Sequence, residues 1–266
     1  MGALETDNVF VRRAAAQALG PMGPEAGVIR ALIGGLRDGD DVVRWSAARA
    51  LGEIGPEAAQ AVPALVAALE DEASLVVLMT ADALGRIGPH AAEAVPALIR
   101  VLRGDDRAVR GAAATALGQI GPRAAGAIPA LTETLWDESA AVRCSAAEAL
   151  GKIEPVTDEV VAALREALDD EAAVVRAFAA RALAPHAGAE DDVMLALTAA
   201  LADENWWARE AAAQGVGKLG PDAVAAVPNL ILALRDGEPK VREAAAQALK
   251  GITGEGFGDD AKAWQE

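Results

Sequence analysis

The sequence is poor in the side chains on which most catalytic and metal sites depend. It has one cysteine, two histidines, no tyrosine and only 3% aromatic residues. Catalysis needs reactive groups that converge in a pocket, and zinc sites use Cys and His at characteristic spacings. One Cys and two separated histidines, His90 and His186, do not make that pattern. The nucleotide-binding loop G-x-x-x-x-G-K-[ST] and the nucleophile turn G-x-S-x-G are missing too. We therefore expect no enzyme activity, no cofactor and no metal.

A long apolar run and an excess of basic charge are also lacking. Without a run of about 18 apolar residues or a signal-peptide pattern, the sequence predicts neither a membrane span nor secretion. The net charge is −16. Because nucleic-acid binding needs Lys and Arg to neutralise phosphates, we expect no nucleic-acid partner and no adhesion to anionic membranes. The single Cys144 has no partner for an internal disulfide, which agrees with a cytoplasmic location.

The sequence does contain a strict internal repeat. The segment RALGEIGP, which starts at Arg49, returns as DALGRIGP, TALGQIGP and EALGKIEP, and less regular copies follow. Each step is 33 residues except the first, which is 32, as the aligned positions show: Leu19, Leu51, Leu84, Leu117, Leu150, Leu183, Val216 and Leu249. A fixed period of this length is typical of proteins built from stacked helical units.

Each repeat reads as two helices. The first is predicted by an apolar stripe with helical spacing, formed by Val43, Ala47, Ala50, Leu51 and Ile54. Gly55–Pro56 ends that helix, and a second stripe follows at Val62, Leu65, Val66 and Leu69. Neither helix can bury its stripe alone, so successive pairs must stack into a continuous core.

The repeated text V-R-x-x-A-A-x-A-L-G-x-I-G, followed by V-P-A-L, resembles the short HEAT-like repeat named for phycobilisome lyases. Artificial consensus HEAT proteins use much the same text, whereas tetratricopeptide units need a tyrosine and ankyrin units need Thr-Pro-Leu-His. The resemblance spans roughly residues 7–253. It implies an all-α fold, a right-handed α-solenoid (superhelix) of about eight 33-residue helix pairs. First helices are expected to begin near residues 8, 41, 74, 107, 140, 173, 206 and 239.

The two ends of the chain depart from the repeat. Ala3 and Leu4 align with the last turn of a second helix whose earlier turns are missing, which predicts an artificial boundary or an end closed by a partner. Residues 254–266 are expected to fold back as a C-terminal cap after the solenoid of residues 1–253. In that cap Phe257 and Trp264 would cover the last repeat.

The resemblance also implies a ladder of Asp and Arg residues between successive repeats. Arg recurs at one repeat position, and Asp stands six residues before most copies, as in Asp38 and Arg44. The third repeat breaks the pattern, because Val77 replaces the Arg and Gly104 replaces the next Asp. Drift in one repeat would explain the break, and so would a locally altered twist or a binding site.

Residues that the framework does not need indicate where a partner would bind. Trp45 and Arg49 point almost directly away from the apolar stripe of their helix, and the resemblance implies that first helices line a concave surface. Aromatic, Met and Arg side chains are the usual anchors of protein interfaces. Alternatively, Trp45 and Leu78 pack on neighbouring helices and the Trp pair stiffens a junction. The predicted partner-binding residues are Phe10, Arg13, Trp45, Arg49, Leu75, Leu78, Met79, Asp82, Arg181, Trp206 and Trp207, with Phe10, Trp45, Leu75 and Leu78 as the main contact.

The function expected from these features is a non-enzymatic scaffold or adaptor that holds a peptide, helix or protein surface in a concave groove. The namesake of the repeat implies an alternative, a bilin lyase-like or chromophore-handling chaperone subunit. Another alternative is an engineered or consensus-derived repeat binding protein, although unequal repeats favour a natural sequence. A base-repair role, known on other HEAT-type folds, conflicts with the acidic charge. The sequence specifies neither the partner nor the oligomeric state.

Replacing Trp45 and Leu78 together by Ser should abolish partner capture and leave helicity and melting temperature nearly unchanged, because these side chains serve binding in this interpretation. Circular dichroism melting checks the second half of this prediction. A collapse in stability would make both residues part of the core.

Overall fold

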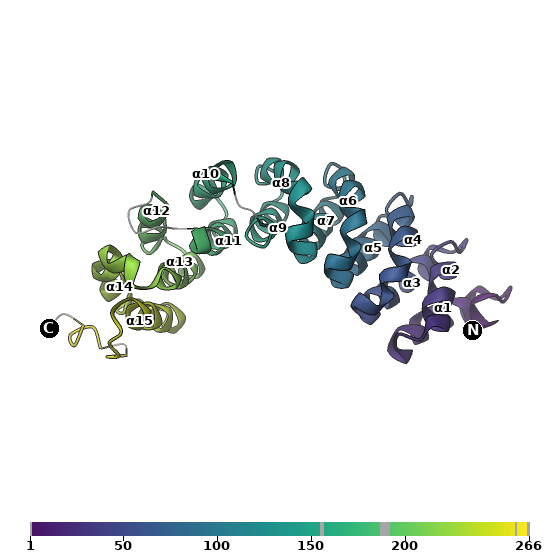
Figure 1. Cartoon of the computed structure of the whole chain (residues 1–266), viewed down its shortest axis with the longest axis horizontal. Helices are drawn as coiled ribbons and strands as arrows, with labels where there is room; N and C mark the ends of the chain where they lie inside the picture. The colour runs from purple at the N-terminus through teal and green to yellow at the C-terminus, as the bar shows by residue number, and fades with distance from the viewer. Residues whose placement is uncertain (1, 155–156, 187–191, 259, 265–266) are drawn as a thin grey trace. The chain divides into compact units, whose positions relative to one another are not determined.

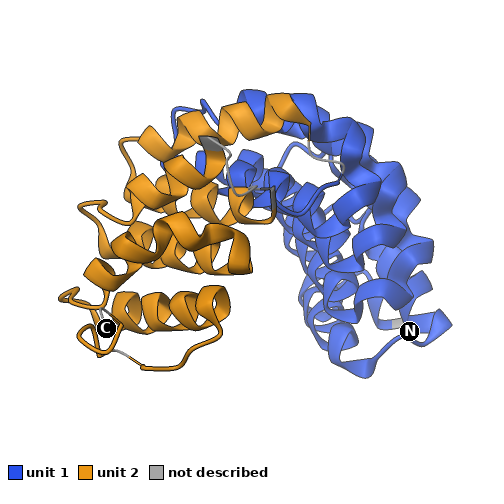
Figure 2. Ribbon diagram, turned by 60° about the vertical axis from the view of Figure 1, so that its left-hand side comes forward, with its two compact units in different colours: residues 1–155 blue, residues 156–266 orange. Residues whose placement is uncertain are grey.

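The computed structural model describes residues 2–154, 157–186, 192–258 and 260–264, and within these residues it contains helices and turns but no β-strand. The chain divides into two compact units, residues 1–155 and 156–266 (Figure 2), which are described separately. In the described residues, unit 1 holds helices α1–α9 and unit 2 holds helices α10–α15 (Figure 1). The predicted all-helical repeat architecture is confirmed.

Each of the first seven repeats supplies one helix to each of two layers, the eighth supplies only α15 in the described residues, and neighbouring first helices pack side by side within each unit (Figure 1). The first helices are α1 (Val9–Leu19), α3 (Asp41–Ile54), α5 (Ser74–Ile87), α7 (Arg107–Ile120), α9 (Ala140–Leu150), α11 (Ala173–Leu183), α13 (Trp206–Lys218) and α15 (Pro239–Thr253). The second helices are α2 (Ala26–Gly35), α4 (Val62–Ala68), α6 (Val95–Val101), α8 (Ile128–Thr134), α10 (Asp158–Glu166), α12 (Asp192–Ala200) and α14 (Val227–Ala233).

The ends of α3 show how the sequence sets the helix boundaries. Asp40 precedes α3 in an extended conformation, and its side chain accepts a hydrogen bond from the N–H of Val43, which satisfies one free donor of the first turn. After Ile54 the chain turns at Gly55, whose φ of 75° suits a residue without a Cβ. The predicted Gly-Pro break is longer than a simple turn, because a 3₁₀ helix over Gly55–Ala61 leads into α4.

The core lies between the two layers and uses the predicted stripes. Val43, Ala47 and Leu51 of α3 and Leu65 of α4 are fully buried. First helices approach one another closely because small residues stand at the contact. A Cβ added to Gly52 would lie only 2.8 Å from the Cα of Ala83 in α5.

A ladder of Arg–Asp pairs joins successive repeats along one edge of each unit, which confirms the ladder that the resemblance implied. The Arg donates from Nε and Nη2 to both carboxylate oxygens of the Asp in the next repeat, so each pair has the two-pronged geometry of a strong ion pair. The Nε–Oδ2 distances are 2.6 to 2.7 Å in all five described pairs: Arg12–Asp38, Arg44–Asp71, Arg110–Asp137, Arg176–Asp203 and Arg209–Asp236.

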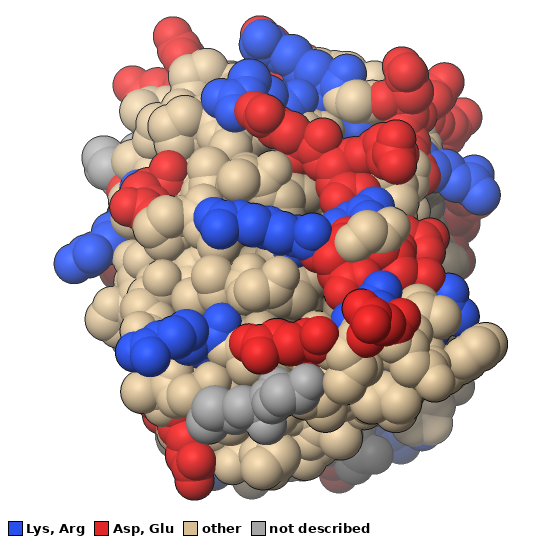
Figure 3. Space-filling model, turned by 90° about the vertical axis from the view of Figure 1, so that its right-hand side faces the viewer, with Lys and Arg blue, Asp and Glu red and all other residues tan. Residues whose placement is uncertain are grey.

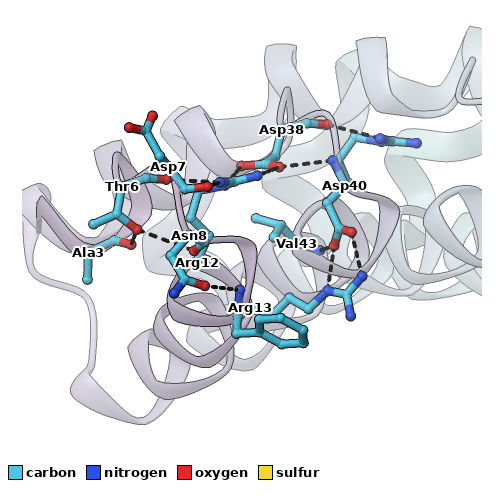
Figure 4. Close-up of polar contacts among 11 residues, drawn as sticks. Ala3, Thr6, Asp7, Asn8, Arg12, Arg13, Asp38, Asp40 and Val43 are labelled. Atoms are coloured by element: carbon cyan, nitrogen blue, oxygen red, sulfur yellow. Dashed lines mark hydrogen bonds and ion pairs between the residues drawn. The ribbon is translucent and has the colours of Figure 1, made fainter.

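Each ladder pair also holds the turns on both sides of it. Figure 4 shows Arg12 reaching from α1 to Asp38, and its Nη1 donates to the carbonyl oxygen of Thr6 at 2.9 Å. Asp38 Oδ1 in turn accepts a hydrogen bond from the N–H of Asp40 at 2.9 Å. One Arg therefore connects the turn before its own helix with the turn before the next first helix.

Hydrogen bonds lower the pKa of the ladder carboxylates, as Asp71 illustrates. Burial by itself would raise the pKa of Asp71, but the hydrogen bonds from Arg44 and from the N–H of Ala73 outweigh burial and lower the pKa below its ordinary value. A carboxyl with a lowered folded-state pKa stabilises the fold above its unfolded pKa, and this contribution is lost as the pH falls through the folded value. The ladder therefore contributes at neutral pH and fails in acid.

One ladder position, between α5 and α7, lacks both partners. Val77 stands where the Arg would be, and Gly104 follows 27 residues later, the separation found in the pairs Arg44–Asp71 and Arg110–Asp137. The two replacements thus remove both halves of a single ion pair. In the sequence, Asp71 stands six residues before Val77, at the spacing of the Asp–Arg pattern. In the structure, however, the carboxylate of Asp71 binds Arg44 of the preceding repeat. The ladder residues on either side of this position, Asp71 and Arg110, both have partners.

Gly52→Ala should destabilise the protein by about 1–3 kcal/mol, because the added methyl meets the backbone of α5 and overpacks a close contact. Gly34→Ala is the matched control, since Gly34 lies in α2 with no atom within 4 Å of an added Cβ. It should be neutral or stabilise by up to about 1 kcal/mol through helix propensity. Urea unfolding followed by circular dichroism measures both, and equal effects would contradict the close approach of α3 and α5.

Restoring the missing pair should reveal a favourable coupling energy. Val77→Arg alone should cost about 1–3 kcal/mol, because Val77 is 7% exposed and the Asp that pairs with the Arg of the other ladder positions is replaced by Gly104. Adding Gly104→Asp should recover about 0.5–3 kcal/mol of that loss. A double-mutant cycle by urea unfolding gives the coupling, and a value near zero would show that the ladder pair does not form there.

Candidate functional site

The first group of predicted partner-binding residues lies on α1, α3 and α5 in unit 1, three helices packed in sequence. Phe10 is 73% exposed and Leu75 is 48% exposed, whereas Trp45 and Leu78 are half-buried. Neither Trp45 nor Leu78 is enclosed in the interior. We call Phe10, Trp45, Leu75 and Leu78 the N-terminal patch; Met79 lies beside it, half-buried on α5.

The predicted arginine next to Phe10 is engaged within the protein. Arg13 donates from Nε to Asp40 Oδ1 at 2.9 Å, and its guanidinium lies 6.0 Å from the centre of the Phe10 ring (Figure 4). The hydrogen bond from Arg13 lowers the pKa of Asp40 below its ordinary value, with further help from the N–H of Val43. Arg13 therefore orients the rim of the N-terminal patch and does not present an unpaired charge.

The other charged residues of this group are also paired. The guanidinium of Arg49 lies 5.7 Å from the centre of the Trp45 ring, at a distance that permits a cation–π interaction. Asp82 lies 2.9 Å from Arg86 one helical turn later. Such internal pairing leaves the N-terminal patch apolar at its centre, with a rim of neutralised charges.

The second group lies in unit 2, on α11 and α13, and forms a separate surface. A depression of about 200 Å³ opens between these helices, and we call it the α11–α13 depression. Two of the predicted partner-binding residues, Arg181 and Trp207, line it together with Ala177, Phe178, Glu210, Ala211 and Gln214. The small side chains of Ala177 and Ala211 leave room for an inserted group.

Two aromatic rings of α11 and α13 lie beside cations. The Arg181 guanidinium lies 5.0 Å from the centre of the Phe178 ring. Trp206 and Trp207 stack with ring centres 6.0 Å apart, and Lys240 Nζ lies 5.4 Å from the Trp206 ring. Trp207 remains 50% exposed, so it is the member of the pair that is available to a ligand.

Phe178 and Asp40 contribute to these surfaces but were not among the predicted residues. Phe178 occupies the repeat position of Met79, so the repeat pattern contained a signal for it. Asp40 is the N-cap of α3, and only the folded chain brings it to Arg13.

The His and Cys residues, which could take part in catalysis or bind a metal, lie outside these surfaces. His90 is exposed and Cys144 is half-buried, while the side chain of His186 lies outside the described residues. Across the described ranges, no group of three or more His, Cys, Asp or Glu side chains is placed to hold a metal ion. In the C-terminal segment the Phe257 and Trp264 rings meet edge to face at 5.0 Å, and their predicted role as a cap stays a prediction.

Charge is distributed unevenly over the surface. Figure 3 shows acidic side chains gathered in a belt along one side of the N-terminal face, with Lys and Arg in separate groups beside and within it. Among the described residues, no helix combines the length and apolar character needed to cross a membrane.

The stacked helix pairs, joined by an Arg–Asp ladder, place this chain in the class of α-solenoid repeat proteins. HEAT repeats match residues 29–107, 95–184 and 194–263, and the chain belongs to the HEAT-repeat family. The narrower resemblance to the phycobilisome-lyase type stays a prediction.

Two solved structures with a similar fold are engineered proteins. One, a target of the Northeast Structural Genomics Consortium, is 26% identical over 94% of this chain and 76% of its own length, with a TM-score of 0.64. A second engineered target of the same consortium is 23% identical, covers 86% of this chain and 98% of its own, and has a TM-score of 0.51. No curated protein matches this chain.

Proposed function

We propose that this chain is a non-catalytic HEAT-repeat scaffold that binds a peptide, helix or protein surface through the N-terminal patch. The observation that carries the proposal is the exposure of Phe10 on the first repeat and of Leu75 on the third, where the repeat framework has no use for large apolar side chains. Half-buried Trp45 and Leu78 extend the same surface on α3 and α5. Clustered exposed apolar side chains of this kind are a common feature of interaction sites.

The composition of the N-terminal patch suits a protein partner. Aromatic residues with a supporting Arg, such as Trp45 with Arg49, are over-represented among the residues that dominate binding energy at interfaces. A nucleic-acid partner is disfavoured because Arg13 and Arg49 already face Asp40 and the Trp45 ring, and because the net charge is −16.

The α11–α13 depression supports a second contact surface on the same scaffold. Its volume of about 200 Å³ and its half-exposed Trp207 suit the insertion of one partner side chain. Arg181 and Glu210 at its edge provide one donor and one acceptor for the partner's polar groups.

The engineered origin of the two similar structures raises the alternative that this chain is itself a designed binder. Unequal repeats favour a natural binding protein, because a consensus design repeats its framework residues. The loss of both ladder charges at Val77 and Gly104 and the unequal residues at Phe10, Trp45 and Leu78 are departures of this kind.

The double variant Phe10→Ser/Leu75→Ser should lose partner binding by at least about tenfold, equal to about 1.4 kcal/mol, with little change in stability because both side chains are exposed. The measurement is affinity capture from a lysate of the source organism, quantified by mass spectrometry, with the full chain as bait.

The matched control is Leu195→Ser/Leu232→Ser, which removes two leucines that are each 64% exposed on second helices of unit 2. It should retain every partner that the wild type captures, and both double variants should melt like the wild type. Equal capture by the wild type and the Phe10/Leu75 variant would rule out the N-terminal patch as the binding surface.

A further inference from the structure

The missing ladder pair leaves an apolar pocket at the edge of unit 1. The pocket has a volume of about 250 Å³ and lies where α4, α5, α6 and α7 meet. Its apolar walls come from Leu69, Val77, Val101 and Val109, and Gly104 replaces the Asp that would cross it. We call it the missing-rung pocket.

The lining of this pocket is more apolar than that of the corresponding depression at the first repeat. The corresponding depression at the first repeat is lined by Gly27, Gly34 and Gly35 together with the charged residues Glu5, Arg30 and Asp38. There the carboxylate of Asp38 is bound by Arg12. The missing-rung pocket differs in offering branched apolar side chains and no carboxylate at its base, so it suits an uncharged, apolar group.

A large apolar side chain stands on the same edge one repeat further along the chain. Trp136 directly follows α8 and is 58% exposed. It occupies the repeat position of Arg103, the residue next to Gly104 at the missing-rung pocket. Unit 1 therefore carries an apolar hollow and an exposed indole ring side by side on one edge.

An exposed ion pair lies between the two features. Arg103 Nη2 is 3.3 Å from Glu133 Oε2, and the two side chains are 69% and 70% exposed. Arg103 belongs to the pocket side and Glu133 to the tryptophan side. A second ion pair, Arg100 to Glu70 at 3.2 Å, forms part of the rim of the pocket.

We propose that this edge is a self-association surface, on which Trp136 of each copy inserts into the missing-rung pocket of a second copy of this chain. A feature that fits a hollow elsewhere on the same molecule produces either a closed pair or an open chain. Because pocket and tryptophan are adjacent on one edge, a two-fold axis between them makes both contacts at once. The result is a closed, symmetric dimer.

Charge complementarity supports a second copy as the occupant. A two-fold axis near the Arg103–Glu133 pair places Arg103 of each copy opposite Glu133 of the other, so the ion pairs exchange partners without leaving an unmatched charge. Beside Trp136, the side chain of Glu138 is 86% exposed and lies 3.3 Å from Arg110 of its own copy. The rim of the pocket carries both a cation and a carboxylate, Arg100 and Glu70, so the exchange between Arg103 and Glu133 is the charge complementarity that favours a second copy.

Sedimentation velocity of the full chain over about 5–500 µM tests the proposal, a range that covers a small interface of modest affinity. The wild type should move from 27.0 kDa towards twice that mass as the concentration rises. Trp136→Ser, which removes the inserted side chain, should weaken dimerisation at least about tenfold. Val77→Arg/Gly104→Asp, which fills the pocket with a restored ion pair, should do the same.

Leu232→Ser is the control, because Leu232 is a 64% exposed apolar residue of unit 2 that is not part of the proposed surface, and it should dimerise like the wild type. Arg103→Glu alone should weaken the dimer, and Arg103→Glu/Glu133→Arg should restore it by reversing both charges. A wild type that stays at 27.0 kDa up to about 500 µM would overturn the proposal. So would growth beyond a dimer, or equal dimerisation by the wild type and the Trp136→Ser variant.

Discussion

Each helix pair of this protein has an apolar stripe that it cannot bury by itself, and contact with the next pair is what covers it. That contact depends on small side chains. Where Gly52 faces Ala83, the two first helices come so close that a single added methyl would meet backbone atoms. Leu51, Leu84 and Leu117 then bury fully behind the contact and repeat the same core at every step. The units are stable because every repeat shields its neighbours.

The Arg–Asp ladder fixes how the turns of successive repeats are positioned relative to each other. Partly buried ion pairs are weak evidence of net stabilisation, since desolvation offsets much of the attraction. The two-pronged geometry of Arg44 with Asp71, and the hydrogen bond from Ala73 to the same carboxylate, instead fix how one turn meets the next. Where Val77 and Gly104 replace such a pair, apolar packing alone continues the stack, and the freed space becomes a pocket.

Because the repeats are regular, the residues that depart from the repeat pattern are informative about function. Positions that repeat faithfully serve packing or the ladder, so large side chains elsewhere need another reason to be there. Phe10 and Leu75 on first helices support a protein-binding surface, and Trp136 beside the missing-rung pocket supports contact between copies. The two surfaces share no residue, which allows one chain to bind a partner and to pair with itself.

The sequence by itself determined the helix pairs, their 33-residue period and the family, because periodic apolar stripes and Gly-Pro breaks act locally and report on every repeat. It also pointed to Phe10, Trp45 and Trp207 as side chains that the framework does not need. Only the tertiary structure decided which charges meet: Arg13 binds Asp40, and Asp71 binds the Arg of the preceding repeat. It likewise showed that Val77 and Gly104 are two halves of one lost contact. Such pairings join residues about 27 positions apart, and no local pattern encodes which of two neighbouring turns a side chain will reach.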